Sequence, residues 1–314
     1  MRQHPANRVP RRPFLRRSVV AVVAVGVATA LSGCGEQVGK GFLPSERDTT
    51  NQTGRIMELW NGSWLAALAV GVLVWGLILW SVVVYRRRRD ATDMPEQVRY
   101  HLPLEITYTV VPLLMIAVLF FFTARDQAAI ADTSARPDLR IEVVGKQWSW
   151  DFNHLDEGVY ETGVQAELTG EPGAEAGLPT LYLPVNERVE FLITSRDVIH
   201  SFWIPAFLYK LDAIPGIVNT FQVVPQRVGT YRGKCAELCG EYHSEMLFNV
   251  RVVPRGEYDA HLAELRAKGQ VGRLGADLGG GGTASAGTEH AGTGAAGTAS
   301  AATGSAPGDG RTEP

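Results

Sequence analysis

The sequence contains few cysteines, three in 314 residues, so each can be assigned a separate task. Cys34 lies near the start, whereas Cys235 and Cys239 lie four residues apart. No cysteine follows Cys239, so the C-terminal part lacks the CxxCH motif that a covalently attached c-type haem requires. Nothing in the composition suggests nucleic-acid binding.

Two stretches of the sequence each lack charged residues of one sign. Residues 1–33 hold six arginines and no acidic residue, so removing them would change the formal net charge from −3 to −3 − 6 = −9. No Lys or Arg occurs between Lys146 and Arg188. Because this stretch follows an aromatic motif, we expect it to form a docking surface for a basic partner, although charge runs are usually solvated faces. Its acidic residues include Asp151, Asp156, Glu157, Glu161, Glu167, Glu171 and Glu175.

The first residues have the layout of an export signal. An arginine-rich start precedes an apolar run over 18–32, and LSGC ends at Cys34. This pattern predicts a lipoprotein-type signal peptide over 1–33, with lipidation of Cys34. An uncleaved membrane helix is the alternative, but the run is short for a span of about 20 residues. The arginines also resemble a twin-arginine export signal, so the export route stays open.

Two long apolar runs predict a transmembrane hairpin. After an extracytoplasmic linker over 34–61, a helix at 62–85 is flanked by aromatic residues at both ends. Four arginines follow directly, which predicts a cytoplasmic loop over 86–103. A second helix at 104–123 contains Pro112, which a membrane helix tolerates when neighbours satisfy the freed carbonyl.

The remaining sequence changes from helical to β-rich. Short runs of β-branched and aromatic residues, broken by Gly and Pro, predict a β-sandwich or Greek-key barrel over 135–255. A surface helix is expected over 256–270. The Gly/Ala/Ser/Thr-rich stretch 271–314 is typical of a disordered tail.

A cluster of soft metal ligands lies in one short stretch: Cys235, Cys239, His243 and Met246, with His200 upstream. Thiolate, imidazole and thioether together favour copper over hard cations, and two thiolates can bridge a pair of metals. A disulfide or a zinc site is the alternative for cysteines at this spacing. Met246 favours copper, because a thioether is a poor zinc ligand and a disulfide needs neither Met nor His.

At this point the chain resembles subunit II of the haem–copper cytochrome c oxidases. The resemblance rests on five motifs in the family's order: LEITYTVVP (104–112), GKQWSW (145–150), DVIHSFWIP (197–205), LDAIPGIVN (211–219) and YRGKCAELCGEYHSEM (231–246). It implies a membrane-anchored all-β protein, in which the two-helix transmembrane hairpin precedes a cupredoxin-like Greek-key β-barrel. It also implies a binuclear CuA centre held by His200, Cys235, the backbone carbonyl of Glu237, Cys239, His243 and Met246.

The resemblance implies further roles. Trp148 matches the residue where electrons enter the family's copper domain, although a lone strand Trp is usually a core residue. The carboxylate of Glu237 would bind a Mg²⁺ shared with subunit I, and Glu105 would lie at the mouth of the proton path called the K channel. Either glutamate could instead be an idle surface group. The family usually has an aromatic residue between its two tryptophans, where this chain has Ser149.

The implied function is that of a respiratory cytochrome c oxidase subunit in a bacterial cell membrane, with the copper domain on the extracytoplasmic side. It would accept electrons from a soluble or membrane-tethered cytochrome c and pass them to subunit I, where oxygen reduction and proton pumping occur. Other oxidase subunits are expected partners, and the chain alone should show no oxidase activity. The alternative is a membrane-anchored copper chaperone for oxidase assembly. A chaperone of that kind normally has one span, and its His lies downstream of the cysteines.

Overall fold

The computed structural model describes residues 35–86, 94, 97–167 and 177–275. The predicted signal peptide over 1–33 and the lipidation site Cys34 lie outside the described residues, as does most of the predicted tail.

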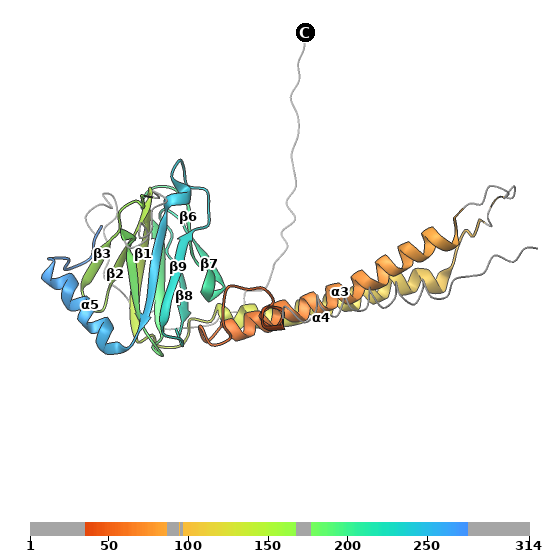
Figure 1. The fold of residues 1–314 in the computed structure, drawn as a ribbon, viewed down its shortest axis with the longest axis horizontal. Helices are drawn as coiled ribbons and strands as arrows, with labels where there is room; N and C mark the ends of the chain where they lie inside the picture. The colour runs from red at the N-terminus through yellow and green to blue at the C-terminus, as the bar shows by residue number, and fades with distance from the viewer. Residues whose placement is uncertain (1–34, 87–93, 95–96, 168–176, 276–314) are drawn as a thin grey trace, which may run out of the picture. The chain divides into compact units, whose positions relative to one another are not determined.

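Two long helices form the hairpin, after a short helix α2 (Gly35–Gly39). They are α3 (Thr53–Val84) and α4 (Leu102–Ile130), which lie side by side in Figure 1. With 32 and 29 residues, both are long and apolar enough to cross a membrane, since about 20 residues suffice. Pro112 is accommodated inside α4 without a break.

Both helices extend beyond the apolar runs that predicted them. The N-terminal turns of α3 lie within the expected linker 34–61, and α4 continues past 123. These added turns carry an ion-pair cluster: Asp126, which is 3% exposed, lies 3.1 Å from Arg55 and 2.9 Å from Arg125. Hydropathy locates only the apolar part of each helix. Polar turns, whose charges are paired, continue the helix beyond this part on the aqueous side.

Within the described residues, ten strands form two five-stranded sheets. The arrangement confirms the expected cupredoxin-like domain in the form of a β-sandwich (Figure 1). One sheet contains, in order, β3 (Val159–Thr162), β2 (Ser149–His154), β1 (Leu139–Lys146), β5 (Val189–Ser195) and β8 (Asn219–Val223). The other contains β4 (Thr180–Pro184), β10 (Leu247–Val253), β9 (Gly229–Cys235), β6 (His200–Ile204) and β7 (Tyr209–Ala213).

An aromatic cluster fills the core between the sheets. Phe202 stacks on Phe248 with ring centroids 4.9 Å apart, and Trp150 meets both rings edge-on at 5.5 and 5.8 Å. Gly233 in β9 leaves room for this packing, because a Cβ there would lie 2.0 Å from Phe248 Cζ. The cluster therefore gives the metal-binding end of the domain a rigid base.

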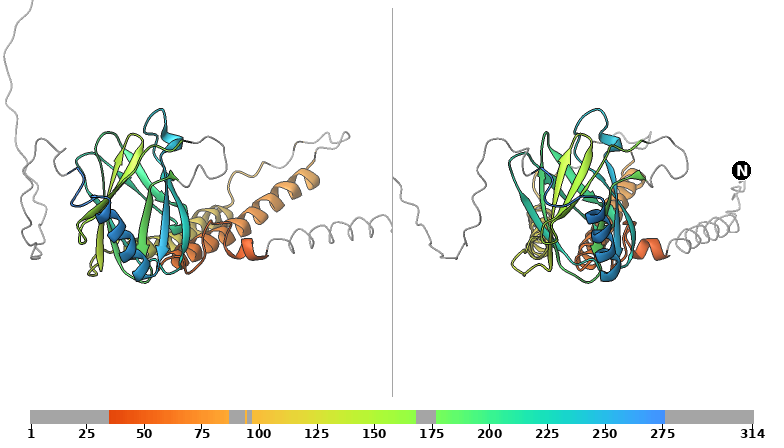
Figure 2. Two further views of the ribbon diagram at one scale, coloured as in Figure 1. Left: turned by 60° about the vertical axis from the view of Figure 1, so that its left-hand side comes forward. Right: turned by 90° about the vertical axis from the view of Figure 1, so that its left-hand side faces the viewer.

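The helix α5 (Arg255–Ala267) lies against the sandwich (Figure 2), where it contacts strands β3 and β4. It buries Tyr258, Leu262 and Leu265. It agrees closely with the surface helix expected over 256–270.

The chain then returns along the first sheet. Gln270 O accepts a hydrogen bond from Tyr160 N at 3.1 Å, and Leu274 N donates to Asn153 Oδ1 at 2.9 Å. Arg273 pairs with Glu142, which is 5% exposed. Residues 271–274 thus belong to the folded domain, and the prediction of a disordered tail from 271 is wrong for them.

The segment that precedes α3 is hydrogen-bonded to the sandwich. Ser45 Oγ donates to Ala206 O at 2.6 Å, in the short helix η2 (Pro205–Phe207). Asn51 N donates to Val224 O at 3.0 Å, and Val224 N donates to the Asn51 side chain at 2.9 Å. These contacts connect the start of the hairpin with the end of β8.

A histidine lies buried beneath α5. His154 is 1% exposed, and its Nδ1 lies 2.9 Å from the hydroxyl of Tyr258. Burial, followed by repulsion from His261, lowers the pKa of His154 to about 3. The folded domain therefore holds His154 neutral, whereas the unfolded chain protonates it near pH 6.5.

This pKa shift predicts acid lability. The stabilisation is complete above pH 6.5 and is lost as the pH falls towards 3, with an upper limit of about 5 kcal/mol. In a soluble fragment of residues 135–314, His154→Gln should make the free energy of unfolding less dependent on pH between 7 and 4. Urea unfolding followed by tryptophan fluorescence measures this dependence. His290→Gln, in the Gly-rich C-terminal stretch, is the control and should retain the wild-type slope. Equal slopes for all three proteins would contradict the prediction.

Candidate metal centre

Strand pairing brings the soft ligands together. Cys235 ends β9, which is hydrogen-bonded to β10 on one side and β6 on the other. On the first side, Cys235 N donates to Met246 O at 3.0 Å. On the second side, Cys235 pairs with Phe202, two residues beyond His200. The connection between β9 and β10 supplies the remaining candidate ligands.

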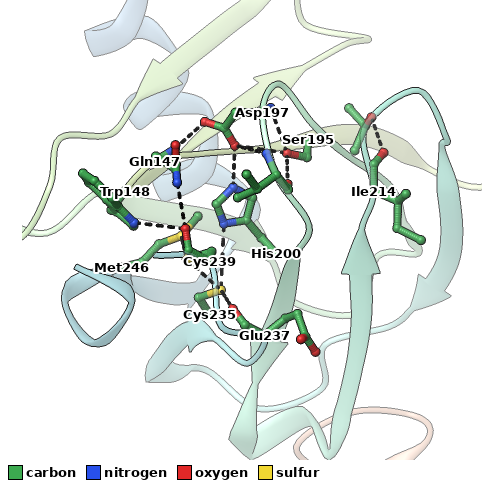
Figure 3. A network of polar contacts seen from close by, with 12 residues as sticks. Gln147, Trp148, Ser195, Asp197, His200, Ile214, Cys235, Glu237, Cys239 and Met246 are labelled. Carbon is green, nitrogen blue, oxygen red and sulfur yellow. Dashed lines mark hydrogen bonds and ion pairs between the residues drawn. The ribbon is translucent and has the colours of Figure 1, made fainter. Parts of the chain in front are cut away.

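The donor atoms face a common space (Figure 3). The ligand atoms of His200, Cys235 and Cys239 all lie within 4.8 Å of one another, and all three residues are buried. Four contacts join the members of the cluster. Cys239 Sγ lies 3.8 Å from Cys235 Sγ, 3.8 Å from Met246 Sδ and 3.5 Å from His243 Nδ1. His200 Nδ1 lies 4.0 Å from Cys235 Sγ.

The backbone carbonyl of Glu237 belongs to the same cluster. Its oxygen lies 3.1 Å from Cys235 Sγ, whereas the Glu237 side chain is exposed. The residue thus presents a hard oxygen to the sulfur cluster and its carboxylate to the surroundings.

The cysteine geometry fits a metal and excludes a disulfide in this structure. Both thiols are free, and 3.8 Å is far beyond the S–S bond length of about 2 Å. Two sulfurs bound to one metal at about 2.3 Å, with a tetrahedral angle, would lie about 3.8 Å apart. The donor set of thiolates, imidazoles and a thioether is consistent with a CuA copper site.

Asp197 orients His200 for metal binding. Its carboxylate lies 2.7 Å from His200 Nε2, which leaves Nδ1 directed towards Cys235. Such a carboxylate fixes the tautomer of a ligating histidine. Gly145 in β1 makes the position possible, because a Cβ there would lie 2.8 Å from His200 Cδ2.

The electrostatics of the cluster differ between the two thiols. Burial raises the pKa of Cys235, but hydrogen bonds with His200 and with backbone groups outweigh it and lower that pKa to about 7. Burial, and then the charge of Cys235, raise the pKa of Cys239. Burial lowers the pKa of His200, yet its contacts with Cys235 and Asp197 more than compensate and raise it. As the pH rises, Cys235 is therefore the first of the two thiols to lose its proton.

Trp148 is half-buried and lies in the turn between β1 and β2. It packs against the connection between β9 and β10, called here the metal loop. Its indole Nε1 donates to Cys239 O at 3.3 Å, and Gln147 Nε2 donates to the same carbonyl at 2.8 Å (Figure 3). Gly240 permits this approach: it has φ +131°, and a Cβ would lie 3.0 Å from Trp148 Nε1. The side chain predicted as the point of electron uptake thus touches the backbone of a candidate ligand.

Glu105 is not part of this cluster. It lies in the first turn of α4, where its Oε1 accepts a hydrogen bond from His101 N at 3.0 Å. The domain follows the opposite end of α4, so Glu105 is separated from the metal centre by the length of the helix.

The acidic run after the aromatic motif does not form one exposed docking face. Four of its members contact side chains within the domain: Asp151 with Lys146 and Arg196, Asp156 with Arg140, Glu157 with Arg255 and Arg266, and Glu161 with His261. For these four the predicted docking surface is wrong, because side chains of the same domain face them. Glu167 is exposed, and Glu171 and Glu175 lie outside the described residues.

Sequence reasoning missed three residues that support the centre. Asp197 holds His200, Gln147 holds the Cys239 carbonyl, and Trp150 Nε1 donates to Met246 O at 3.4 Å. The signal for Asp197 was present, because it lies three residues before His200 in the motif DVIHSFWIP.

Comparison with known proteins gives consistent similarities. Residues 139–253 match the family model "Cytochrome C oxidase subunit II, periplasmic domain". The chain is 45% identical to the "Probable cytochrome c oxidase subunit 2" of Streptomyces coelicolor, over 88% of this chain and 96% of the relative. It is 34% identical to the "Cytochrome c oxidase subunit 2" of Mycobacterium tuberculosis, over 80% and 82% of the two chains.

Among solved structures, the periplasmic domain of subunit II of cytochrome oxidase from Bradyrhizobium japonicum matches with 33% identity and a TM-score of 0.40. The match covers 43% of this chain and 97% of that structure.

The contact between Asp197 and His200 yields a prediction. Asp197→Asn should keep the fold but weaken copper binding about 10- to 100-fold, because the amide no longer fixes the tautomer of His200. Copper titration against a competing chelator measures the affinity. Asp156→Asn is a matched control that removes a carboxylate paired with Arg140, away from the cluster. A wild-type affinity for Asp197→Asn would refute the positioning role.

Proposed function

The chain belongs to the cytochrome c oxidase subunit II family, and we propose that it serves its oxidase through a binuclear CuA centre that receives electrons from cytochrome c. It is a membrane protein and a subunit of a haem–copper oxidase complex. The proposed centre would pass electrons on to the haem–copper site of subunit I, where oxygen reduction and proton pumping occur.

One observation carries the proposal: the convergence of the soft donors around one space. His200, Cys235, Glu237 through its carbonyl, Cys239, His243 and Met246 would hold the two coppers. A copper pair bound there supplies a centre that can take up and release one electron at a time. Two thiolates within 3.8 Å of each other suit a bridging role.

The surrounding residues restrict movement of the ligands. Asp197 fixes His200, Trp150 donates to Met246 O, and Gln147 donates to Cys239 O. Ligands held from outside keep their positions when the charge of the site changes. Such rigidity favours rapid electron transfer, because little has to reorganise.

Trp148 is the proposed point of electron uptake. Its half-buried ring contacts the surroundings on one side and the Cys239 carbonyl on the other. An electron entering at this indole therefore has one hydrogen bond to cross before it reaches the backbone of a ligand. The proposed donor is a cytochrome c, either soluble or tethered to the membrane.

Two glutamates take the remaining proposed roles. The exposed carboxylate of Glu237 would bind a Mg²⁺ shared with subunit I, since hard oxygen ligands suit that ion. Glu105, at the end of α4 remote from the copper domain, would lie at the entrance of the proton path in subunit I. With the copper domain outside a bacterial cell membrane, Glu105 lies at the cytoplasmic side.

Membership of the cytochrome c oxidase subunit II family excludes the alternative that the chain is a copper chaperone. The relatives cover most of the chain, and their shared name is that of the oxidase subunit. Two long apolar helices precede the domain, and Met246 lies in contact with Cys239.

The copper centre is tested with two substitutions. After copper loading, the wild-type 135–314 fragment should bind two coppers per chain and show an EPR hyperfine pattern of one electron shared by two copper nuclei. Cys239→Ser should lose this pattern, because a bridging thiolate is removed. Met246→Leu should keep both coppers and shift the reduction potential, because only a weak thioether ligand is lost.

A copper count with EPR and a redox titration distinguishes the outcomes. A single-copper signal in the wild type, or an unchanged shared-electron pattern in Cys239→Ser, would refute the binuclear assignment.

A further inference from the structure

Tyr242 is a second aromatic residue at the proposed point of electron uptake. Its ring lies 4.8 Å from that of Trp148, in an edge-to-face arrangement with an angle of 74° between the ring planes. The side chain is 36% exposed and directly precedes the candidate ligand His243. Tyr242 therefore combines surface exposure with contact to Trp148.

The side chain at position 149, by contrast, is not accessible to a partner. Ser149 is 3% exposed, and its Oγ donates to Val164 O at 2.8 Å. Position 149 is thus occupied by a buried hydroxyl that fixes a neighbouring loop. Any aromatic contact beside Trp148 has to come from elsewhere in the chain.

The loop that follows β3 is tied to the segment around Tyr242. Ser149 holds the carbonyl of Val164, a residue that is 67% exposed. Gln165 Nε2 donates to Glu245 Oε2 at 2.7 Å, which connects this loop with the short helix η3 (His243–Glu245) that follows Tyr242. We call Trp148 and Tyr242 together the uptake surface.

The charges around the uptake surface are mainly acidic. Glu241 is exposed beside Tyr242, and Glu245 is half-buried. Two basic side chains, Lys146 in β1 and Arg196 directly after β5, both contact the buried carboxylate of Asp151, at 2.7 and 2.9 Å. The uptake surface therefore suits a partner whose apolar contact face is ringed by basic residues.

On the basis of the proposed function, we propose that Tyr242 is a contact and specificity residue for the redox partner. Its exposed ring, together with Trp148, forms the centre of the docking face. Aromatic residues surrounded by a polar rim are typical of residues that dominate binding energies. Tyr242 contributes contact area, while electron uptake itself remains at Trp148.

The proposal is tested on the assembled oxidase in membranes, with Tyr242→Ala and Tyr242→Phe. The probe is a reduced, soluble, lysine-rich mitochondrial cytochrome c, and oxygen consumption is the readout. Tyr242→Ala should lower kcat/KM about tenfold, mainly through a higher KM, because contact area is lost. Tyr242→Phe should restore most of it, because the ring remains.

A second electron donor separates docking from structural damage. Hexaammineruthenium(II) needs no protein contact face, so Tyr242→Ala should retain the wild-type rate with it, together with the wild-type copper EPR spectrum. If both donors slow equally, Tyr242 acts by holding Trp148 or His243, and the proposal is wrong. Val228→Ala, an exposed residue between β8 and β9, is the matched surface control.

Trp148→Ala distinguishes this proposal from the function on which it rests. If Trp148→Ala slows oxidation of cytochrome c and Tyr242→Ala does not, the role of Tyr242 is refuted while electron uptake at Trp148 stands. If neither substitution has an effect, electrons enter elsewhere, and both proposals fail.

Discussion

The metal centre depends on one constraint, the pairing of β9 with a neighbour on each side. Because β10 and β6 both bond to this strand, Cys235 is fixed with Met246 across one ladder and the start of β6 across the other. The loop between β9 and β10 then has to fold back over the end of the sandwich. Gly240, with φ +131°, allows it to do so while Trp148 approaches. Strand pairing thus sets the metal site, and the loop supplies its chemistry.

Much of the site was predictable because four of its side chains lie within one short stretch of sequence. Cys235, Cys239, His243 and Met246 share a single loop, so their proximity follows from spacing alone. His200 was included as a soft ligand from its residue type, and the pairing of β6 with β9 explains why it lies beside the others. The Glu237 carbonyl was assigned from the family resemblance, since a backbone oxygen leaves no local pattern. Asp197 was missed although it lies three residues before His200 in the same motif, because an acidic residue at that position has many possible partners.

The fold class was predictable from periodicity, whereas the limits of its elements were not. The apolar runs located both membrane helices but omitted the polar turns around Asp126, whose charges are neutralised by Arg55 and Arg125. Composition also assigned residues 271–274 to the tail, although Leu274 and Arg273 bond to Asn153 and Glu142. The acidic run misled for a related reason: local charge does not reveal which basic residues the fold brings opposite. In each case long-range pairing overrides a local signal.

The two tryptophans of the aromatic motif, Trp148 and Trp150, have different roles. Both indoles donate to carbonyls of candidate copper ligands, Trp148 to Cys239 and Trp150 to Met246. Contact with the metal loop therefore does not distinguish them. Trp150 is fully buried and packs on Phe202 and Phe248, so it can only support the site. Trp148 lies in the turn before β2, and its ring stays partly exposed. Exposure alone thus makes one residue structural and leaves the other able to meet a partner.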